Sequence, residues 1–472
     1  MGYKTTLCDV SLDGGRYGIA APAVDFKPGL PAYLRITDIN DDGTLNPSDR
    51  KSVDDSSAGN YLLHEGDIVF ARTGNSTGRN YYYDPRDGEY AYAGFLIKFS
   101  LDPRKINPRY MKYYAQSKQY WDWVSSFNTG STRGNINAKT YASMPIDLLS
   151  RQIQDGIVAI CDAIDDKIRI NRQLNDYLAN LCETIASRYC NDRNSRLRDI
   201  CYQVADHVDY DNANQETYVS TESLMQNKGG RQLASSLPTT GKITRYKAGD
   251  TLISNIRPYF KKIWYAPFEG TCSGDVIVFR ANDPSNAPYL HACLRQDSFF
   301  DYVMQGAKGT KMPRGDKKQM MEFKVASSCS AEDLILLDSV IKQRSDNDSE
   351  ITKLQKLRDT LLPKLMSGEI DVSKIDLTQL TNNHLLVLGH NVPNRYWKGR
   401  LWKPSLIMFC RRCRTCLIRH SSNIWLKYSE SRCCQLRKHQ RRRICWRCFS
   451  RQKRSKAARR KPSLTMKARF ST

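Results

Sequence analysis

The chain has 472 residues and a formal net charge of +24, a length that fits roughly two to four domains. This charge does not by itself indicate nucleic-acid binding, because residues 385–472 hold 25 Lys and Arg against one acid, whereas the preceding residues hold 48 basic and 48 acidic side chains. No apolar run reaches about 18 residues and no signal sequence opens the chain, so we expect a cytoplasmic protein that contacts no membrane.

Residues 1–149 have the mixed pattern of an α/β module. Alternating or continuous apolar stretches predict strands, Gly-rich polar stretches predict loops, and an aromatic stretch with helical spacing predicts a helix. The predicted elements are strands at 31–39, 66–72 and 92–99, a helix at 110–124, and loops at 40–43, 73–79 and 130–135.

Residues 150–190 form the next predicted unit, a single long helix. Its apolar positions follow steps of 4, 3 and 4 residues, which is the heptad seam of a paired helix, at Ile153, Ile157, Ile160, Ile164, Leu174, Leu178, Leu181 and Ile185. Lys167 and Asn171 fill the two places missing from the seam. From 150 to 188 the helix would measure about 58 Å. Such a stripe needs a partner stripe, although an ordinary core helix is the alternative.

The second half of the chain repeats the order of the first. Four blocks of residues 191–330 match blocks of residues 1–149 at offsets of 183, 180, 179 and 176 residues, which indicates a duplicated module. Residues 191–199 are predicted to be the linker into this second module. A second long helix follows at about 332–366, within a unit of residues 331–370. Arg344, Asn347 and Arg358 interrupt its apolar seam, and Pro363 should end or kink it near Leu362.

The predicted fold class is therefore α+β. Two tandem α/β modules, at residues 1–149 and 191–330, are each followed by a long helix, at residues 150–190 and 331–370. The two helices are expected to pack as an antiparallel coiled coil, because each alone leaves an apolar stripe exposed.

Each module offers a Gly-rich basic loop after an aromatic helix, together with polar residues after a buried strand. Such loops suit close approach to phosphates, and Arg and Asn can read the edges of guanine and adenine. The candidate DNA-binding residues are Arg72, Asn75, Ser76, Arg79, Ser131, Thr132, Arg133, Asn135, Asn255, Arg257, Lys308, Thr310, Lys311 and Arg314. Solvated turns are the alternative interpretation of each loop taken alone. The recurrence in both halves favours a binding role.

Signatures of catalysis are absent from the sequence. We find no phosphate-binding loop, no nucleophile elbow, no His-Glu-x-x-His zinc pair and no Asn/Asp-Pro-Pro-aromatic methyltransferase tetrapeptide. His64, His207 and His291 have no evident catalytic partners in the sequence. We therefore predict no catalytic residue and no metal site in this chain.

Residues 371–472 are predicted to be a C-terminal extension without a stable fold, basic and rich in Cys and Arg from about residue 385. Two Cys-x-x-Cys pairs with nearby ligand types permit a zinc interpretation, at Cys410, Cys413, Cys416, His420, Cys445 and Cys448. An out-of-frame extension is the alternative, and the Arg-rich background without core patterning favours it. Such a tail would bind nucleic acid through charge alone. The eight cysteines of the body are unevenly spaced and are expected to be free thiols.

This organisation resembles the specificity subunit of type I restriction–modification systems. The resemblance covers roughly residues 1–385 and is carried by residues 33–39, 66–72, 130–135, 144–145 and 361–370. It implies a subunit without chemistry of its own that binds double-stranded DNA at a split site. Residues 1–149 and 191–330 would then be tandem α/β target-recognition domains, with one on each half of the site. A spacer of about 58 Å would separate the modules by about one and a half to two turns of duplex.

The resemblance also implies partners and their cofactors. Two adenine methyltransferase subunits, which use S-adenosylmethionine, and two restriction–translocase subunits, which use ATP and Mg²⁺, would dock on such a chain, while the chain itself would bind no cofactor. Two other hypotheses remain open from the residues. One is a fused restriction–methylation enzyme whose motifs are not apparent, and the other is a non-catalytic assembly scaffold whose loops are solvated turns.

Overall fold

The computed structural model describes residues 3–46, 49–127, 134–189 and 194–375. The cysteines and histidine of the zinc interpretation lie outside these residues, as does nearly all of the predicted C-terminal extension. The described part mixes helices and sheets, which confirms the predicted α+β class. None of its helices combines the length and the apolar character needed to cross a membrane.

The first module contains two four-stranded sheets and a two-stranded closing pair, with strand orders β2-β9-β6-β7, β3-β5-β4-β8 and β1-β10. Its elements are β1 (Tyr3–Thr6), β2 (Arg16–Tyr17), β3 (Ala23–Asp25), β4 (Ala32–Leu34), β5 (Lys51–Val53), β6 (Asp67–Ala71), β7 (Asn80–Tyr82), β8 (Tyr90–Tyr92), β9 (Leu96–Ser100), α1 (Pro108–Tyr114), α2 (Lys118–Ser125), α3 (Ala138–Ala142) and β10 (Pro145–Leu148). All five residues of β6 are buried, which explains why the sequence shows a continuous apolar run there.

The second module has an equivalent four-stranded sheet and closing pair but a second sheet of three strands, with strand orders β12-β18-β15-β16, β11-β19 and β13-β14-β17. Its elements are β11 (Ser195–Arg196), α5 (Leu197–Ile200), β12 (Cys201–Gln203), β13 (His207–Asp209), β14 (Lys242–Tyr246), β15 (Thr251–Ser254), β16 (Ile263–Tyr265), β17 (Gly270–Cys272), β18 (Val276–Ala281), α6 (Ala287–Leu294), α7 (Asp297–Gln305), α8 (Lys317–Met321) and β19 (Lys324–Val325). Strands β15 and β6 hold equivalent central places, so the structure confirms the predicted duplication.

Three predicted elements of the first module are divided in the structure. The strand predicted at 31–39 ends at Leu34 and is followed by a 3-10 turn, and the strand predicted at 92–99 is two strands, β8 and β9. The second division is a tight turn in which the N–H of Leu96 donates to the carbonyl oxygen of Ala93 at 2.8 Å. The helix predicted at 110–124 is α1 and α2, because the Ser117 side chain accepts from the N–H of Tyr120 and starts a new helix.

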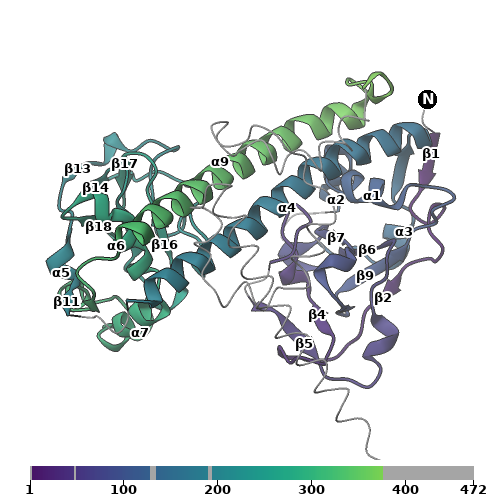
Figure 1. The fold of residues 1–472 in the computed structure, drawn as a ribbon. Coiled ribbons are helices and arrows are strands. Elements are labelled where there is room, and N and C mark those ends of the chain that lie inside the picture. Colours follow the sequence, from purple (N-terminus) through teal and green to yellow (C-terminus); the bar gives the residue numbers. More distant parts are fainter. Residues whose placement is uncertain (1–2, 47–48, 128–133, 190–193, 376–472) are drawn as a thin grey trace, which may run out of the picture. The chain divides into compact units, whose positions relative to one another are not determined.

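The two modules are joined by two long helices, α4 (Arg151–Ser187) and α9 (Ala331–Ser367), each of 37 residues. They lie side by side in Figure 1. Their directions are opposite, because Arg188, which follows α4, pairs with Asp333 in the first turn of α9 at 2.9 Å, whereas Ile157 and Leu365 share the other core. The predicted pair of long helices is therefore confirmed.

The seam of α4 departs from the prediction in its second half. Leu174 is 38 % exposed, whereas Asn171, Asn175, Ala179 and Cys182 are buried. A straight α-helix drifts relative to a strict heptad, so the buried stripe moves by about one position over this length. The predicted seam is correct for the half of α4 beside the first module and wrong at Leu174.

Pro363 does not end α9, which continues to Ser367. Leu362 and Leu365 are buried in the core of the first module, and this packing holds the last turns although the proline removes one backbone donor. Beyond α9, Val372 is buried in the same core. The predicted extension therefore begins later than residue 371.

The predicted linker at residues 191–199 is only partly tested, because residues 190–193 lie outside the description. Ser195 and Arg196 form β11, which pairs with β19. This pairing repeats that of β1 with β10, so the end of the predicted linker is the first strand of the second module.

Candidate nucleic-acid interface

Those candidate residues of the first module that the structure describes lie around the end of β6. The chain leaves β6 at Ala71, and Thr73 forms an antiparallel bridge with Asn135. The carbonyl oxygen of Arg72 accepts from the N–H of Ile136 at 2.9 Å, and the Thr77 hydroxyl donates to the carbonyl oxygen of Gly134 at 2.9 Å. The loop after β6 and the end of the Gly130 loop are therefore joined by backbone pairing, although they are about 60 residues apart in sequence.

The second module brings its candidates together in the same way. Ile256, just after β15, forms an antiparallel bridge with Arg314. The N–H of Arg257 donates to the carbonyl oxygen of Pro313 at 2.8 Å, and the N–H of Gly315 donates to that of Asn255 at 3.3 Å. Each module thus presents a bridge between a strand-end loop and a Gly-rich loop.

The candidate side chains of the first module differ in their exposure and in their contacts within the protein. The Arg72 guanidinium lies 5.0 Å from the centre of the Tyr17 ring, and Arg79 pairs with Asp41 at 2.7 Å. Ser76 is buried, whereas Asn75 and Asn135 are exposed. The predicted residues Ser131, Thr132 and Arg133 lie outside the described residues.

The second candidate surface carries more exposed charge. Lys308, Thr310, Lys311 and Arg314 are exposed. Lys308 lies 3.6 Å from Asp316 and Arg314 lies 3.2 Å from Asp275, both as surface pairs. Such pairs contribute little to stability, so the cations can exchange their carboxylates for phosphate or a base edge.

Two further candidates of the second module are positioned by backbone constraints. Arg257 has a left-handed backbone with φ of 50°, which is uncommon for a residue with a side chain. Asn255 is buried, and its Oδ1 has no hydrogen-bond partner within the described part of the chain. The Asn255 side chain therefore lies inside the module and is not part of the exposed candidate surface.

Asp316 orders the chain directly after the Gly-rich loop of the second module. Its carboxylate accepts from the N–H groups of Lys318 and Gln319 and so caps α8. Backbone hydrogen bonds from Gln319 and Lys318 lower the pKa of this carboxyl, and the nearby Lys308 contributes further. The ionised form of Asp316 is therefore favoured, and its carboxylate orders the chain at the end of the loop.

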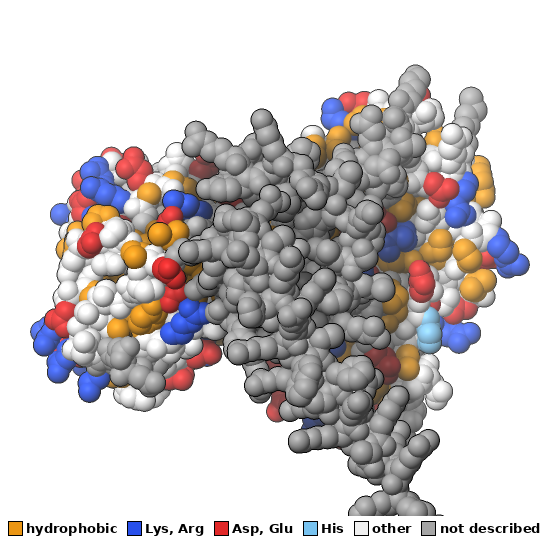
Figure 2. All heavy atoms as spheres, in the orientation of Figure 1, with side chains coloured by type: hydrophobic (Ala, Val, Ile, Leu, Met, Phe, Trp, Pro, Cys, Tyr) orange, Lys and Arg blue, Asp and Glu red, His pale blue; other side chains and the backbone are white. Residues whose placement is uncertain are grey.

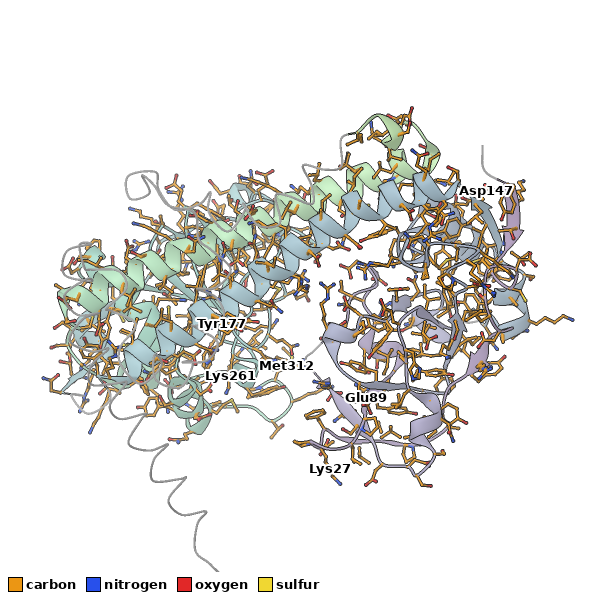
Figure 3. All side chains as sticks on the ribbon, turned by 45° about the vertical axis from the view of Figure 1, so that its right-hand side comes forward. Lys27, Glu89, Asp147, Tyr177, Lys261 and Met312 are labelled. Carbon is orange, nitrogen blue, oxygen red and sulfur yellow. The ribbon has the colours of Figure 1, made fainter. Side chains whose placement is uncertain are left out.

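Two exposed residues beside these loops were missed from the sequence. Tyr17 comes from β2 and supports Arg72, and Met312, which is 47 % exposed, lies within the second loop. Figure 3 shows Met312 and Lys261 on the loops of the second module. No sequence signal identifies Tyr17, because it lies far from Arg72 along the chain. Met312 sits inside the predicted loop, but its apolar side chain does not suggest polar recognition.

Charges of both signs are mixed on the part of the surface that Figure 2 shows outside the grey atoms. In Figure 2, Lys and Arg side chains are interspersed with Asp and Glu. This agrees with the neutral balance of residues 1–384. Recognition would therefore depend on where single cations are placed, not on a general positive field.

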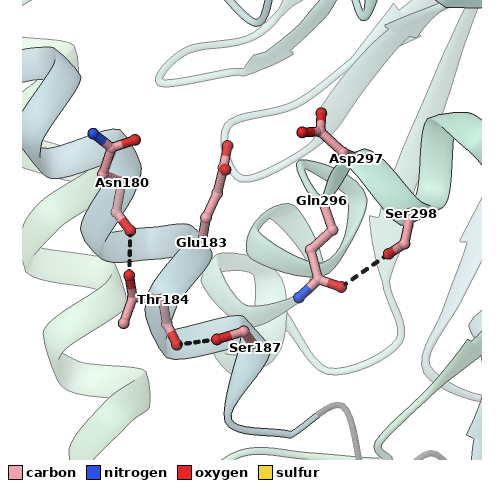
Figure 4. Close-up of a pocket in the computed structure, with 7 residues that line it drawn as sticks. All are labelled: Asn180, Glu183, Thr184, Ser187, Gln296, Asp297 and Ser298. Carbon is pink, nitrogen blue, oxygen red and sulfur yellow. Dashed lines mark hydrogen bonds between the residues drawn. The ribbon is translucent and has the colours of Figure 1, made fainter.

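A hollow between α4 and the α6–α7 turn is separate from these loops (Figure 4). No candidate DNA-binding residue among those that the structure describes lines it; its lining is Asn180, Glu183, Thr184, Ser187, Gln296, Asp297 and Ser298. The Thr184 and Ser187 hydroxyls bond to the backbone of α4 itself. Lys228 pairs with Glu183 at 2.8 Å and with Asp297 at 3.0 Å. The hollow is therefore part of the contact between α4 and the second module.

Comparison with known proteins gives these loops a context. Residues 33–180 match the family model of the type I restriction modification DNA specificity domain. The type I restriction enzyme EcoDI specificity subunit of Escherichia coli is 22 % identical over 187 residues, which are 38 % of this chain and 41 % of that protein. The match therefore spans less than half of that relative's length.

Two solved structures are also similar. The S subunit of a type I restriction-modification system from M. genitalium has 16 % identity and a TM-score of 0.45, covering 77 % of this chain and 96 % of that chain. The HsdS subunit from Thermoanaerobacter tengcongensis has 14 % identity and a TM-score of 0.28, covering 78 % and 97 %. Residues 33–180 of this chain are therefore similar to a type I restriction modification DNA specificity domain.

Proposed function

We propose that this chain is the DNA sequence-specificity subunit of a type I restriction–modification complex. Each module reads one half of a split site in double-stranded DNA, and the paired helices α4 and α9 set the distance between the halves. The observation that carries the proposal is the repetition of one loop-to-loop bridge, Thr73 with Asn135 and Ile256 with Arg314, in both modules. Two equivalent surfaces on one helix pair suit a bipartite target.

The chain contributes binding and spacing to this complex and no catalysis. Methylation of adenine with S-adenosylmethionine belongs to two methyltransferase subunits that dock on the chain. Translocation and cleavage with ATP and Mg²⁺ belong to two restriction subunits. The complex works in the cytoplasm, where its DNA target lies.

Footprinting tests this proposal on DNA that carries a site selected by the complex from a random duplex library. The full chain with its methyltransferase partner should protect two short segments separated by an unprotected or weakly protected gap of fixed length. A scaffold without reading loops would give no sequence-dependent protection, and a single continuous footprint would contradict two separate readers. Binding of radiolabelled S-adenosylmethionine by the isolated chain would favour a fused enzyme instead.

A further inference from the structure

The two loop bridges carry the same pair of residue types in exchanged positions. In the first module, Arg72 precedes the bridge on the strand side and Asn135 stands on the loop side. In the second module, Asn255 takes the strand side and Arg314 takes the loop side. The equivalence is structural, because Ile136 N–H donates to the Arg72 carbonyl as Gly315 N–H donates to the Asn255 carbonyl. Among these four positions each bridge therefore has one arginine, from the strand-end segment in the first module and from the Gly-rich loop in the second, where Arg257 also follows the bridge residue Ile256.

The Arg72 guanidinium is oriented before any ligand arrives. It lies 5.0 Å from the centre of the Tyr17 ring, and the Tyr17 hydroxyl accepts from the N–H of Ala138 at 3.1 Å. The Arg72 Nε atom is buried without a hydrogen-bond partner in the described structure, whereas the residue as a whole is partly exposed. An arginine stacked on an anchored ring loses less side-chain freedom on binding than a solvated one.

Arg314 is also held, by a different contact. Its guanidinium lies 3.2 Å from the carboxylate of Asp275, and its side chain is 56 % exposed. Asp275 is part of the same arrangement, because its carbonyl oxygen accepts from the N–H of Asn255 at 2.8 Å. The carboxylate thus holds the guanidinium near the bridge, while more than half of the Arg314 side chain stays exposed.

We propose that Arg72 and Arg314 are the guanine-reading side chains of the two modules. The inference rests on the proposed function and adds the base class: each half-site contains a G·C pair, whose guanine O6 and N7 accept two N–H bonds from the guanidinium. Because the guanidiniums come from opposite sides of equivalent bridges, the guanine need not occupy the same place in both halves.

Substitution by lysine separates base reading from charge. Lysine keeps the positive charge but lacks the planar fork that makes two parallel bonds. In Arg72→Lys, the preference for guanine at one position of one half-site should fall about 5- to 150-fold, while the other half-site is unchanged. Arg314→Lys should give the reciprocal result. Arg72→Gln is a second variant for the first module, and thermal melting shows that each variant is folded.

Arg104→Lys and Arg198→Lys are matched controls. Arg104 lies shortly after the end of β9, where Ser100 pairs with Asp67. Asp67 begins β6, whereas Arg72 follows the other end of that strand. Arg198 precedes β12, whose Cys201 pairs with Ala281 at one end of β18. The bridge lies near the other end of β18, where Val276 pairs with Ser254. Both controls should leave every base preference within about twofold, because exposed cations away from base edges contribute charge alone.

The measurement is selection from a random duplex DNA library by the full chain with its methyltransferase partner, followed by sequencing. Loss of guanine preference at one position in one half-site supports the inference. A uniform weakening on all sequences identifies a phosphate contact and overturns it, as does an unchanged motif. If the unsubstituted complex selects no split motif, the proposed function itself fails, which is a different outcome from failure of the arginine assignment.

Discussion

Lys228 shows how a single buried charge fixes the second module to α4. It is 9 % exposed and pairs with Glu183 of α4 and Asp297 of α7. Lys228→Met leaves both carboxylates without this partner, so we expect the free energy of unfolding to fall by about 1–3 kcal/mol. Urea denaturation measures this. Lys342→Met, which removes an exposed pair with Asp338, should change it by no more than about 0.5 kcal/mol; equal effects would refute the special role of Lys228.

His291 makes stability depend on pH. Burial lowers the pKa of His291 well below its usual value, and Arg295 and Arg344 lower it further. The folded protein therefore keeps the imidazole neutral, whereas the unfolded chain binds a proton below about pH 6.5. The free energy of unfolding should decrease as pH falls below that value, by up to about 1.4 kcal/mol per pH unit.

His291→Gln isolates this contribution. The variant should be less stable than the unsubstituted protein at pH 7.5, because the contact of His291 Nδ1 with the Thr251 hydroxyl at 3.2 Å is lost. The difference should shrink at pH 5.5, since only the unsubstituted protein has to exclude a proton from this site. Urea denaturation at pH 7.5, 6.5 and 5.5 gives the comparison. A difference that stays constant with pH would show that His291 does not titrate in this range.

The candidate site was predictable in its residue types but not in its geometry. The Gly-rich loops and the polar residues after buried strands are visible in the sequence, and the structure joins them at Thr73–Asn135 and Ile256–Arg314. The burial of Ser76 and Asn255 was not predictable. Their side chains turn inward because of the path of the whole loop, which no local pattern encodes.

At the scale of the elements, a polar layer crosses the helix pair. Asn175 donates to Asp348 at 2.6 Å, and Asn347 donates to Asn175 at 2.8 Å, with both asparagines buried. Asn171 and Lys167 both contact the carboxylate of Glu350. Polar groups at such positions satisfy each other only in one register, so they specify the alignment of the helices.

Replacement of this layer should be non-additive. Asn175→Leu removes the hydrogen bonds that Asn175 makes with Asn347 and Asp348 and should lower the free energy of unfolding by about 1–3 kcal/mol. The double variant Asn175→Leu/Asn347→Leu should recover part of this loss, because two leucines can pack together. Gln173→Leu, at an exposed position of the same helix, is the control. Urea denaturation of the two single variants and the double variant gives a double-mutant cycle. Additive losses of the free energy of unfolding would contradict an energetic coupling of Asn175 with Asn347.

The sequence predicted the long helices well and their seam less well. Apolar spacing identifies α4 and α9 to within a residue at most ends. The position of Leu174 was wrong because a heptad written on one helix ignores drift and the partner's register. The polar interruptions at Lys167, Asn171 and Asn347 were visible in the sequence, but which of them meet follows only from the two helices together.

For the whole molecule, duplication is the organising feature. Both modules have the same order of strands in their central sheet, close with a pair made by their first and last strands, and end in a helix of 37 residues. The repeat was visible in the sequence because turn residues and buried strands recur at nearly constant offsets. The small second sheet differs, with four strands in the first module and three in the second, and no sequence pattern predicted this difference.

Lengthening the helix pair tests the central claim that α4 and α9 set the spacing of two DNA readers. A heptad is inserted after Asn171 in α4 and another before Glu350 in α9, which leaves the contacts on either side in register. Each helix grows by about 10 Å. Library selection by the altered complex should return the same two half-sites with the gap lengthened by up to about three base pairs. Unchanged spacing with both half-sites intact, or one continuous motif, would contradict the account.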